Sequence, residues 1–263
     1  AETGAARTIS DSLIQLFGTN KLQWAMMLTG FIVGIPLFYN VGFVLLLPLA
    51  FAVIYRTGAN TLLIAIPMLA ALSVTHGFLP PHPSPMALSV QLQAAPGKVL
   101  LYGIIIAIPA IIVAGPIFAK TLQRIKTPPL QLFQQHETKQ SLPGILSSYT
   151  SALLPAVLLI IFSIIPFIST PSKQVQDLLT FIGDPVIILL ISLLFATYVL
   201  GWRKGYALKT IMNWYGDAVK EVAVILLIIA GAGALKQVLV DSGVNTTIAQ
   251  QLGSIPVHPL VLG

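Results

Sequence analysis

Long runs of apolar residues follow one another along most of the chain, separated by short polar stretches. A helix needs about 20 residues to cross the hydrocarbon core of a bilayer, and most of the runs approach that length. They are continuous blocks, whereas a membrane β-barrel would show short segments of alternating apolar and polar residues. The pattern predicts membrane-spanning helices near residues 22–39, 41–55, 60–79, 99–119, 148–168, 178–200 and 221–234.

The composition supports this reading of the pattern. Hydrophobic residues make up 56% of the chain and charged residues only 8%, with a mean hydropathy of +0.90. Soluble domains are roughly one quarter charged, so a soluble protein is excluded. We therefore predict an all-α polytopic membrane protein with about seven or eight transmembrane helices. The absence of cysteine rules out disulfides and thiolate metal sites within these residues.

The net charge is +6. The positions of the basic residues indicate the orientation of the chain, because Lys and Arg concentrate in cytoplasmic loops. If the first predicted span runs outward, the outer connections hold only Lys98 and Lys173. The inner connections hold ten basic residues: Lys21, Arg56, Lys120, Arg124, Lys126, Lys139, Arg203, Lys204, Lys209 and Lys220. This orientation requires residues 80–98 to begin and end on the outer side. That segment therefore dips into the membrane and returns, or lies at the outer face.

The two ends of the chain carry similar sequences. "ETGAARTISDSL" from Glu2 matches "DSGVNTTIAQQL" from Asp241 in its acidic, hydroxyl, Gly, Thr, Ile and Leu positions. Chance similarity between two short amphipathic pieces is the alternative explanation. If the repeat is real, residues 1–119 are the remainder of a first repeat, 120–147 a proline-interrupted cytoplasmic linker, and 148–263 the start of a second. Because the chain also lacks an initiator Met and ends inside a new apolar run, we expect a fragment truncated at both ends.

Two interruptions of the apolar runs are candidates for a binding site, because a broken membrane helix leaves backbone polar groups that need partners. In "GIPLFYNVGF", Pro36 lacks a backbone donor and Asn40 is a polar amide between apolar runs. In residues 221–252 we expect a hairpin broken at Gly231 and Gly233. Asn40 could equally cap a helical hairpin, and the Asp241 and Ser242 that follow the glycines could be a simple loop cap.

The third interruption is residues 73–89, "SVTHGFLPPHPSPMALS". Its four prolines predict extended or polyproline backbone, which would expose polar groups beside Thr75, His76, His82 and Ser84. A histidine satisfied by a carbonyl is the ordinary structural explanation. Two histidines that flank a proline cluster in a membrane chain favour a functional role.

The sequence "GFLPPHPSPMALS", preceded by "IPLFYNVGFVLLLPLAF" and followed by "GAGALKQVLVDSGV", resembles the gluconate permease family. The resemblance extends over essentially the whole chain. It implies a multi-pass secondary transporter of the bacterial inner membrane, in the ion transporter superfamily, with an inverted repeat and re-entrant helical hairpins. It further implies sugar-acid substrates such as gluconate, an outlying D-serine branch, and coupling to protons. A homo-oligomer is compatible with this architecture.

The residues expected to line or shape the site are Asn40, Thr75, His76, His82, Ser84, Gly231, Gly233, Asp241 and Ser242, with Glu2 and Thr3 added by the repeat. The candidates for the coupled proton are His76, His82 and Asp241, since imidazole titrates near neutral pH and a carboxyl inside a membrane is commonly functional. The expected partners are a sugar acid, a proton and the lipid bilayer, without nucleic acid, cofactor or metal.

Two competing functions make different demands on the sequence. An intramembrane enzyme is disfavoured, because the sequence has no His-Glu-x-x-His, Gly-x-Ser-x-Gly or phosphate-binding glycine motif. A passive channel also uses broken helices. Uptake against a gradient separates a channel from a transporter.

Overall fold

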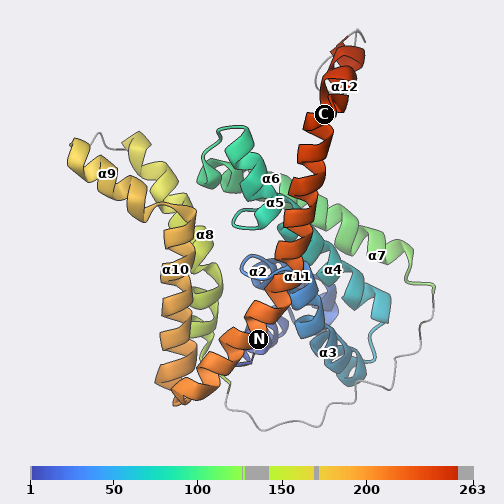
Figure 1. Cartoon of the computed structure of the whole chain (residues 1–263). Coiled ribbons are helices and arrows are strands. Elements are labelled where there is room, and N and C mark those ends of the chain that lie inside the picture. The colour runs from blue at the N-terminus through green and yellow to red at the C-terminus, as the bar shows by residue number, and fades with distance from the viewer. Residues whose placement is uncertain (1, 126, 128–141, 169–171, 254–263) are drawn as a thin grey trace. The chain divides into compact units, whose positions relative to one another are not determined.

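The computed structural model describes residues 2–125, 127, 142–168 and 172–253, and in these residues all regular structure is helical. The chain forms two compact units, Ala1–Tyr206 and Ala207–Gly263, which are described separately (Figure 1). Six helices of the described residues are long and apolar enough to cross a membrane. The prediction of an all-α polytopic membrane protein is therefore confirmed.

The described residues of the first unit form ten α-helices. Wider helical turns at Val113–Ile117 and Thr197–Gly201 continue α6 into α7 and extend α10. The helices are α1 (Ala5–Phe17), α2 (Leu22–Gly34), α3 (Tyr39–Thr57), α4 (Thr61–Phe78), α5 (Pro83–Gln91), α6 (Pro96–Ile112), α7 (Phe118–Thr121), α8 (Ile145–Ile168), α9 (Lys173–Ile182) and α10 (Pro185–Ala196).

Two predicted spans differ from the helices observed. The span predicted at residues 22–39 is interrupted, because α2 has only 13 residues and ends at Gly34, shortly before Pro36. The span predicted at 178–200 is divided between α9 and α10. The Asp184 side chain accepts a hydrogen bond from the Val186 N–H, and Pro185 occupies the first helical position, so a new helix begins there.

Helices α2 and α4 pack closely through two glycines of α2. A Cβ on Gly30 would lie 2.6 Å from the backbone oxygen of Met68, and a Cβ on Gly34 would collide with the Thr75 hydroxyl. Glycines four residues apart allow this approach, as in many membrane helix pairs. Met26, Leu46, Met68 and Leu72 fill the buried core beside the contact. The position of Gly34 is therefore fixed by its contact with α4.

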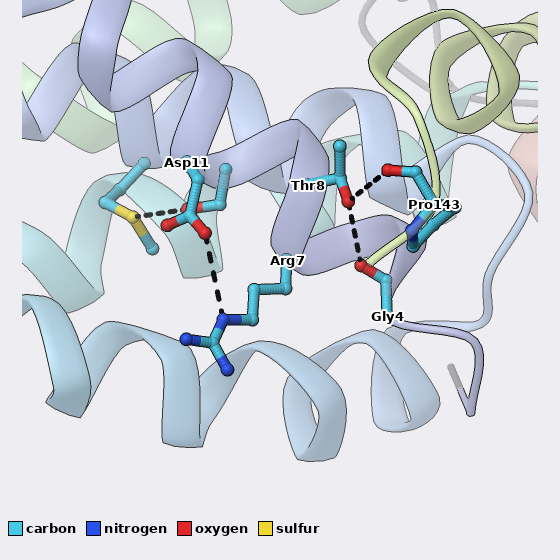
Figure 2. Close-up of polar contacts among 7 residues, drawn as sticks. Gly4, Arg7, Thr8, Asp11 and Pro143 are labelled. Atoms are coloured by element: carbon cyan, nitrogen blue, oxygen red, sulfur yellow. Dashed lines mark hydrogen bonds and ion pairs between the residues drawn. The ribbon is translucent and has the colours of Figure 1, made fainter. Parts of the chain in front are cut away.

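Helix α1 begins against the chain that leads into α8 (Figure 2). The Thr8 hydroxyl lies 3.1 Å from the Pro143 oxygen and 3.4 Å from the Gly4 oxygen. One turn later, the Ser12 and Tyr149 hydroxyls are 2.9 Å apart. The Thr8 contact reaches Pro143 near the end of the predicted 120–147 linker, and the Ser12 contact reaches Tyr149 just beyond it.

The second unit consists of α11 (Leu208–Asp241) and α12 (Val244–Gly253). Helix α11 continues through Gly231 and Gly233, so the break predicted at these glycines is wrong. The turn instead lies at Ser242 and Gly243, where Gly243 has a φ of 72°. A glycine costs a helix only about 1 kcal/mol and keeps its backbone donor, so the surrounding helix-forming residues carry the helix across.

Candidate functional site at the proline and histidine breaks

The proline-rich segment after α4 forms a turn and then a helix. Helix α5 begins at Pro83, with His82 as the residue preceding it. The prediction of extended backbone is therefore wrong from Pro83 onward. Proline fits the first turn of a helix, where the backbone N–H groups have no acceptor within the helix. Pro83 and Pro85 occupy such positions.

This turn meets the break between α2 and α3. Phe38 precedes α3 just as His82 precedes α5, and the ring centroids of these two residues are 6.2 Å apart. The ring of His76, in the last turn of α4, lies 4.9 Å from that of His82 and 5.9 Å from that of Phe38. We call Phe38, His76 and His82 the histidine cluster. It brings two interruptions of the sequence together in space.

The two histidines of the cluster have different surroundings. His82 is 4% exposed, and its Nε2 lies 2.9 Å from the Gly34 carbonyl oxygen at the end of α2. His76 is partly exposed, and its Nδ1 is buried without a hydrogen-bond partner among the described residues. A polar atom of this kind is costly to bury unless something pairs with it. His76 therefore has an open position for a ligand or a proton.

Two further predicted residues lie beside the cluster. Asn40 is the second residue of α3 and Ser84 the second residue of α5, and both are exposed. Neither Phe38 nor His82 caps its helix with a side-chain hydrogen bond. The N-terminal ends of both helices therefore reach the cluster with an amide and a hydroxyl at their second positions.

Residues 22–97 offer the cluster mainly backbone and imidazole groups for electrostatic interactions. Between Lys21 and Lys98 the sequence contains no Asp, Glu, Lys or Arg except Arg56, which is in the last turn of α3 at the opposite end from Phe38. The N-terminus of a helix carries a partial positive charge and unpaired N–H groups. Such an arrangement can accept a carboxylate, while amide, hydroxyl and imidazole groups can bond to hydroxyls.

Thr75 has a packing role in this structure. Its side chain is fully buried, and its hydroxyl donates toward the carbonyls of Ala71 and Leu72 in its own helix, at 2.9 and 3.0 Å. The same hydroxyl occupies the space that a side chain on Gly34 would need. Thr75 therefore positions Gly34 beside the cluster.

The remaining predicted residues lie elsewhere. Glu2 and Thr3 precede α1, where Gly4 packs on Leu142 and Pro143. Gly231, Gly233, Asp241 and Ser242 lie in the second unit. There the Asp241 carboxylate accepts a hydrogen bond of 2.8 Å from Gln237, and the Ser242 hydroxyl donates to the Leu239 oxygen.

The two copies of the end-to-end repeat have the same local structure. Gly4 and Gly243 both have left-handed backbone, with φ of 77° and 72°, and a helix follows each of them. The N–H of Thr8 donates to the Gly4 oxygen at 3.0 Å, and that of Thr247 to the Gly243 oxygen at 3.2 Å. The repeat and its inverted arrangement both stay predictions.

Sequence reasoning missed Gly34 and Phe38. The spacing of Gly30 and Gly34 was an available signal for a close helix contact. No local signal indicated that Phe38 and the Gly34 carbonyl would meet residues more than 35 positions away. Among the described residues, no three His, Asp or Glu side chains gather to hold a metal ion.

Comparison with known proteins identifies the family. The model of the family described as "GntP family permease" matches residues 1–263. The chain belongs to the GntP permease family. The predicted resemblance to gluconate permeases is thereby confirmed, and the chain is a permease-family member and not an enzyme.

Several curated GntP-type proteins are similar over the whole chain. It is 42% identical to the "Gnt-II system L-idonate transporter" and 42% identical to the "High-affinity gluconate transporter", both of Escherichia coli (strain K12). It is 37% identical to the "Gluconate permease" of Bacillus subtilis (strain 168). Each alignment covers 100% of the chain and 60 to 61% of the relative. The chain thus spans about three fifths of the length of these relatives. No solved structure matches it.

Proposed function

We propose that the protein imports gluconate or a closely related sugar acid across the bacterial inner membrane by proton symport. Membership of the GntP family over the whole chain is the observation that carries this proposal. The relatives named for L-idonate and gluconate support a sugar acid as the substrate class. The six membrane-spanning helices support a multi-pass location.

The histidine cluster is the proposed substrate site within the first unit. A sugar acid presents one carboxylate and several hydroxyls. The N-terminal ends of α3 and α5 suit the carboxylate, and Asn40, Ser84 and the open Nδ1 of His76 suit hydroxyls. Transporters commonly bind substrate where discontinuous helices meet, which is the arrangement at Phe38 and His82.

The other predicted site residues stay proposed without a placement relative to the histidine cluster. Gly231, Gly233, Asp241 and Ser242 are proposed from the family resemblance, and Glu2 and Thr3 from the repeat. We propose His76, His82 and Asp241 as candidates for the coupled proton. This assignment rests on their titratable side chains and on the cost of placing such groups in a membrane.

Uptake by the whole protein in sealed vesicles tests the proposal. Labelled gluconate should accumulate inside when the external solution is acidified, and a protonophore should abolish the accumulation. A passive channel would equilibrate gluconate without concentrating it. Failure to accumulate any sugar acid or D-serine would overturn the proposal.

A competition panel tests the substrate assignment. Unlabelled gluconate, idonate and D-serine are added in turn against labelled gluconate. We expect sugar acids to compete more strongly than D-serine, because residues 22–97, which include the cluster, contain no carboxylate to pair with an ammonium group. Stronger competition by D-serine would favour the alternative of a small hydroxy-acid permease.

A further inference from the structure

The end of α2 is stabilised by a side chain from a distant part of the sequence. The last carbonyls of a helix receive no hydrogen bond from an N–H of the same helix, so other groups must donate to them. At the end of α2, the Ile35 N–H donates to the Phe31 oxygen at 3.2 Å, and Nε2 of His82 lies 2.9 Å from the Gly34 oxygen. A carbonyl can only accept, so Nε2 carries the hydrogen and donates it.

This hydrogen bond joins the two breaks directly. It spans 48 positions of the sequence and is buried. Thr75 packs closely against Gly34, and it belongs to the helix that leads to His82. Phe38 packs against the rings of both histidines. The end of α2 and the start of α5 are therefore fixed to each other through one imidazole N–H.

His76 contrasts with His82 in the same cluster. Its Nδ1 is buried but unpartnered among the described residues, and its ring is the more accessible of the two. One histidine thus uses a ring nitrogen to hold the backbone, and the other has a ring nitrogen available.

We propose that His82 is a positioning residue that caps the C-terminus of α2, and that His76 is the histidine of the pair that meets the substrate or the coupled proton. The proposal rests on the proposed function and narrows it, because it removes His82 from the candidates for the coupled proton. What the transporter needs from residue 82 is a hydrogen-bond donor to the Gly34 carbonyl. It does not need a titrating group there.

Two substitutions of His82 separate these requirements. His82→Gln keeps an N–H donor but cannot titrate, whereas His82→Leu removes the donor and leaves a buried carbonyl unpaired. We expect His82→Gln to lose about threefold in uptake, because the amide replaces a well-placed ring donor, while it still concentrates gluconate with the pH dependence of the wild type. We expect His82→Leu to lose about tenfold or more in uptake, with a lower Tm. His76→Gln should alter the KM or the pH profile while leaving the Tm near the wild type.

The outcomes are distinct. If His82→Gln equilibrates gluconate but no longer concentrates it, His82 carries the proton and the proposal is wrong. If His82→Leu matches the wild type in both uptake and Tm, the cap has no role and the proposal is equally wrong. The Tm comparison of Gln and Leu at residue 82 uses the whole protein in detergent without substrate. It therefore tests the cap even if the wild type transports no sugar acid, a result that would overturn the proposed function alone.

Discussion

The chain around the histidine cluster and the glycine segment of α11 are both apolar stretches that contain helix-disfavouring residues. At the cluster, α2 ends at Gly34 and α4 at Phe78, and His82, the residue before α5, bonds to the carbonyl at the end of α2. In α11, the helix passes Gly231 and Gly233, and a Cβ at either glycine would meet nothing within 4 Å.

The difference shows what ends a membrane helix. Pro48 and Pro67 lie inside α3 and α4, so a single proline does not suffice. At the cluster, the interruption coincides with close packing and with a polar side chain that satisfies the freed carbonyl. A helix in an apolar environment can stop only where another group replaces its lost hydrogen bonds.

The largest expected effect comes from substituting the glycine that this packing fixes. In Gly34→Ala, the new methyl group collides with Thr75, which forces α2 away from α4 and moves the carbonyl that His82 holds. We expect a loss of stability of about 1–3 kcal/mol, as for other overpacked cores, and loss of most gluconate uptake. Thermal unfolding and vesicle uptake of the whole protein measure the two effects.

Gly231→Ala is the matched control for that substitution. A Cβ at this helical glycine meets nothing within 4 Å. The substitution should therefore leave the Tm unchanged or raise it, because alanine favours the helix by up to about 1 kcal/mol over glycine. Equal losses of Tm in the two alanine variants would contradict the packing difference between the two regions.

Removing the Phe38 ring, which contacts the rings of both histidines, should have the next largest effect. Phe38→Ala removes two ring contacts, each of a type worth about 0.5–1.5 kcal/mol, and should raise the KM for gluconate by about tenfold. Phe118→Ala, at an exposed position of α7, is the control. A KM that changes equally in both variants would show that the Phe38 ring has no special role.

A smaller effect is expected at the start of α3. Asn40→Ala removes an exposed amide that we propose bonds to a substrate hydroxyl. Loss of one hydrogen bond of about 0.5–1.5 kcal/mol should raise the KM roughly three- to tenfold without changing the Tm. An unchanged KM would exclude Asn40 from the site.

The smallest effect is expected at Thr75, although it is adjacent to His76. Thr75→Val keeps the shape and removes a hydroxyl that donates only within its own helix. Uptake should change by about twofold or less, because a bond of this local kind adds little to helix stability. A larger loss in uptake at an unchanged Tm would assign Thr75 a direct substrate contact.

Much of the fold follows from local patterns that the sequence displays. Continuous apolar runs identify the spans of α3, α4 and α8, because their length and hydropathy are dictated by the bilayer. The division of α9 from α10 was missed, although Asp184 followed by Pro185 is a recognisable helix start. The apolar residues on both sides concealed it.

The candidate site was predictable only in part. His76 and His82 stand out because titratable groups are rare in membrane spans. The bond from His82 to Gly34 depends on α2 packing against α4, which no local pattern specifies. The predicted helix break at the glycines of α11 was wrong, because glycine permits an unusual backbone conformation but does not impose one.

The most direct test of the central claim asks whether gluconate occupies the space beside the histidine cluster. The 263 residues contain no cysteine, so Ser84→Cys at the start of α5 and Leu92→Cys just after its end can be introduced singly into a cysteine-free form of the whole protein. The rate of modification by a small maleimide is then measured with and without gluconate. At about ten times the Kd, gluconate should slow modification of Ser84→Cys by about tenfold and leave Leu92→Cys unaffected. If saturating gluconate leaves both rates unchanged in variants that still transport it, the substrate binds elsewhere and the account is wrong.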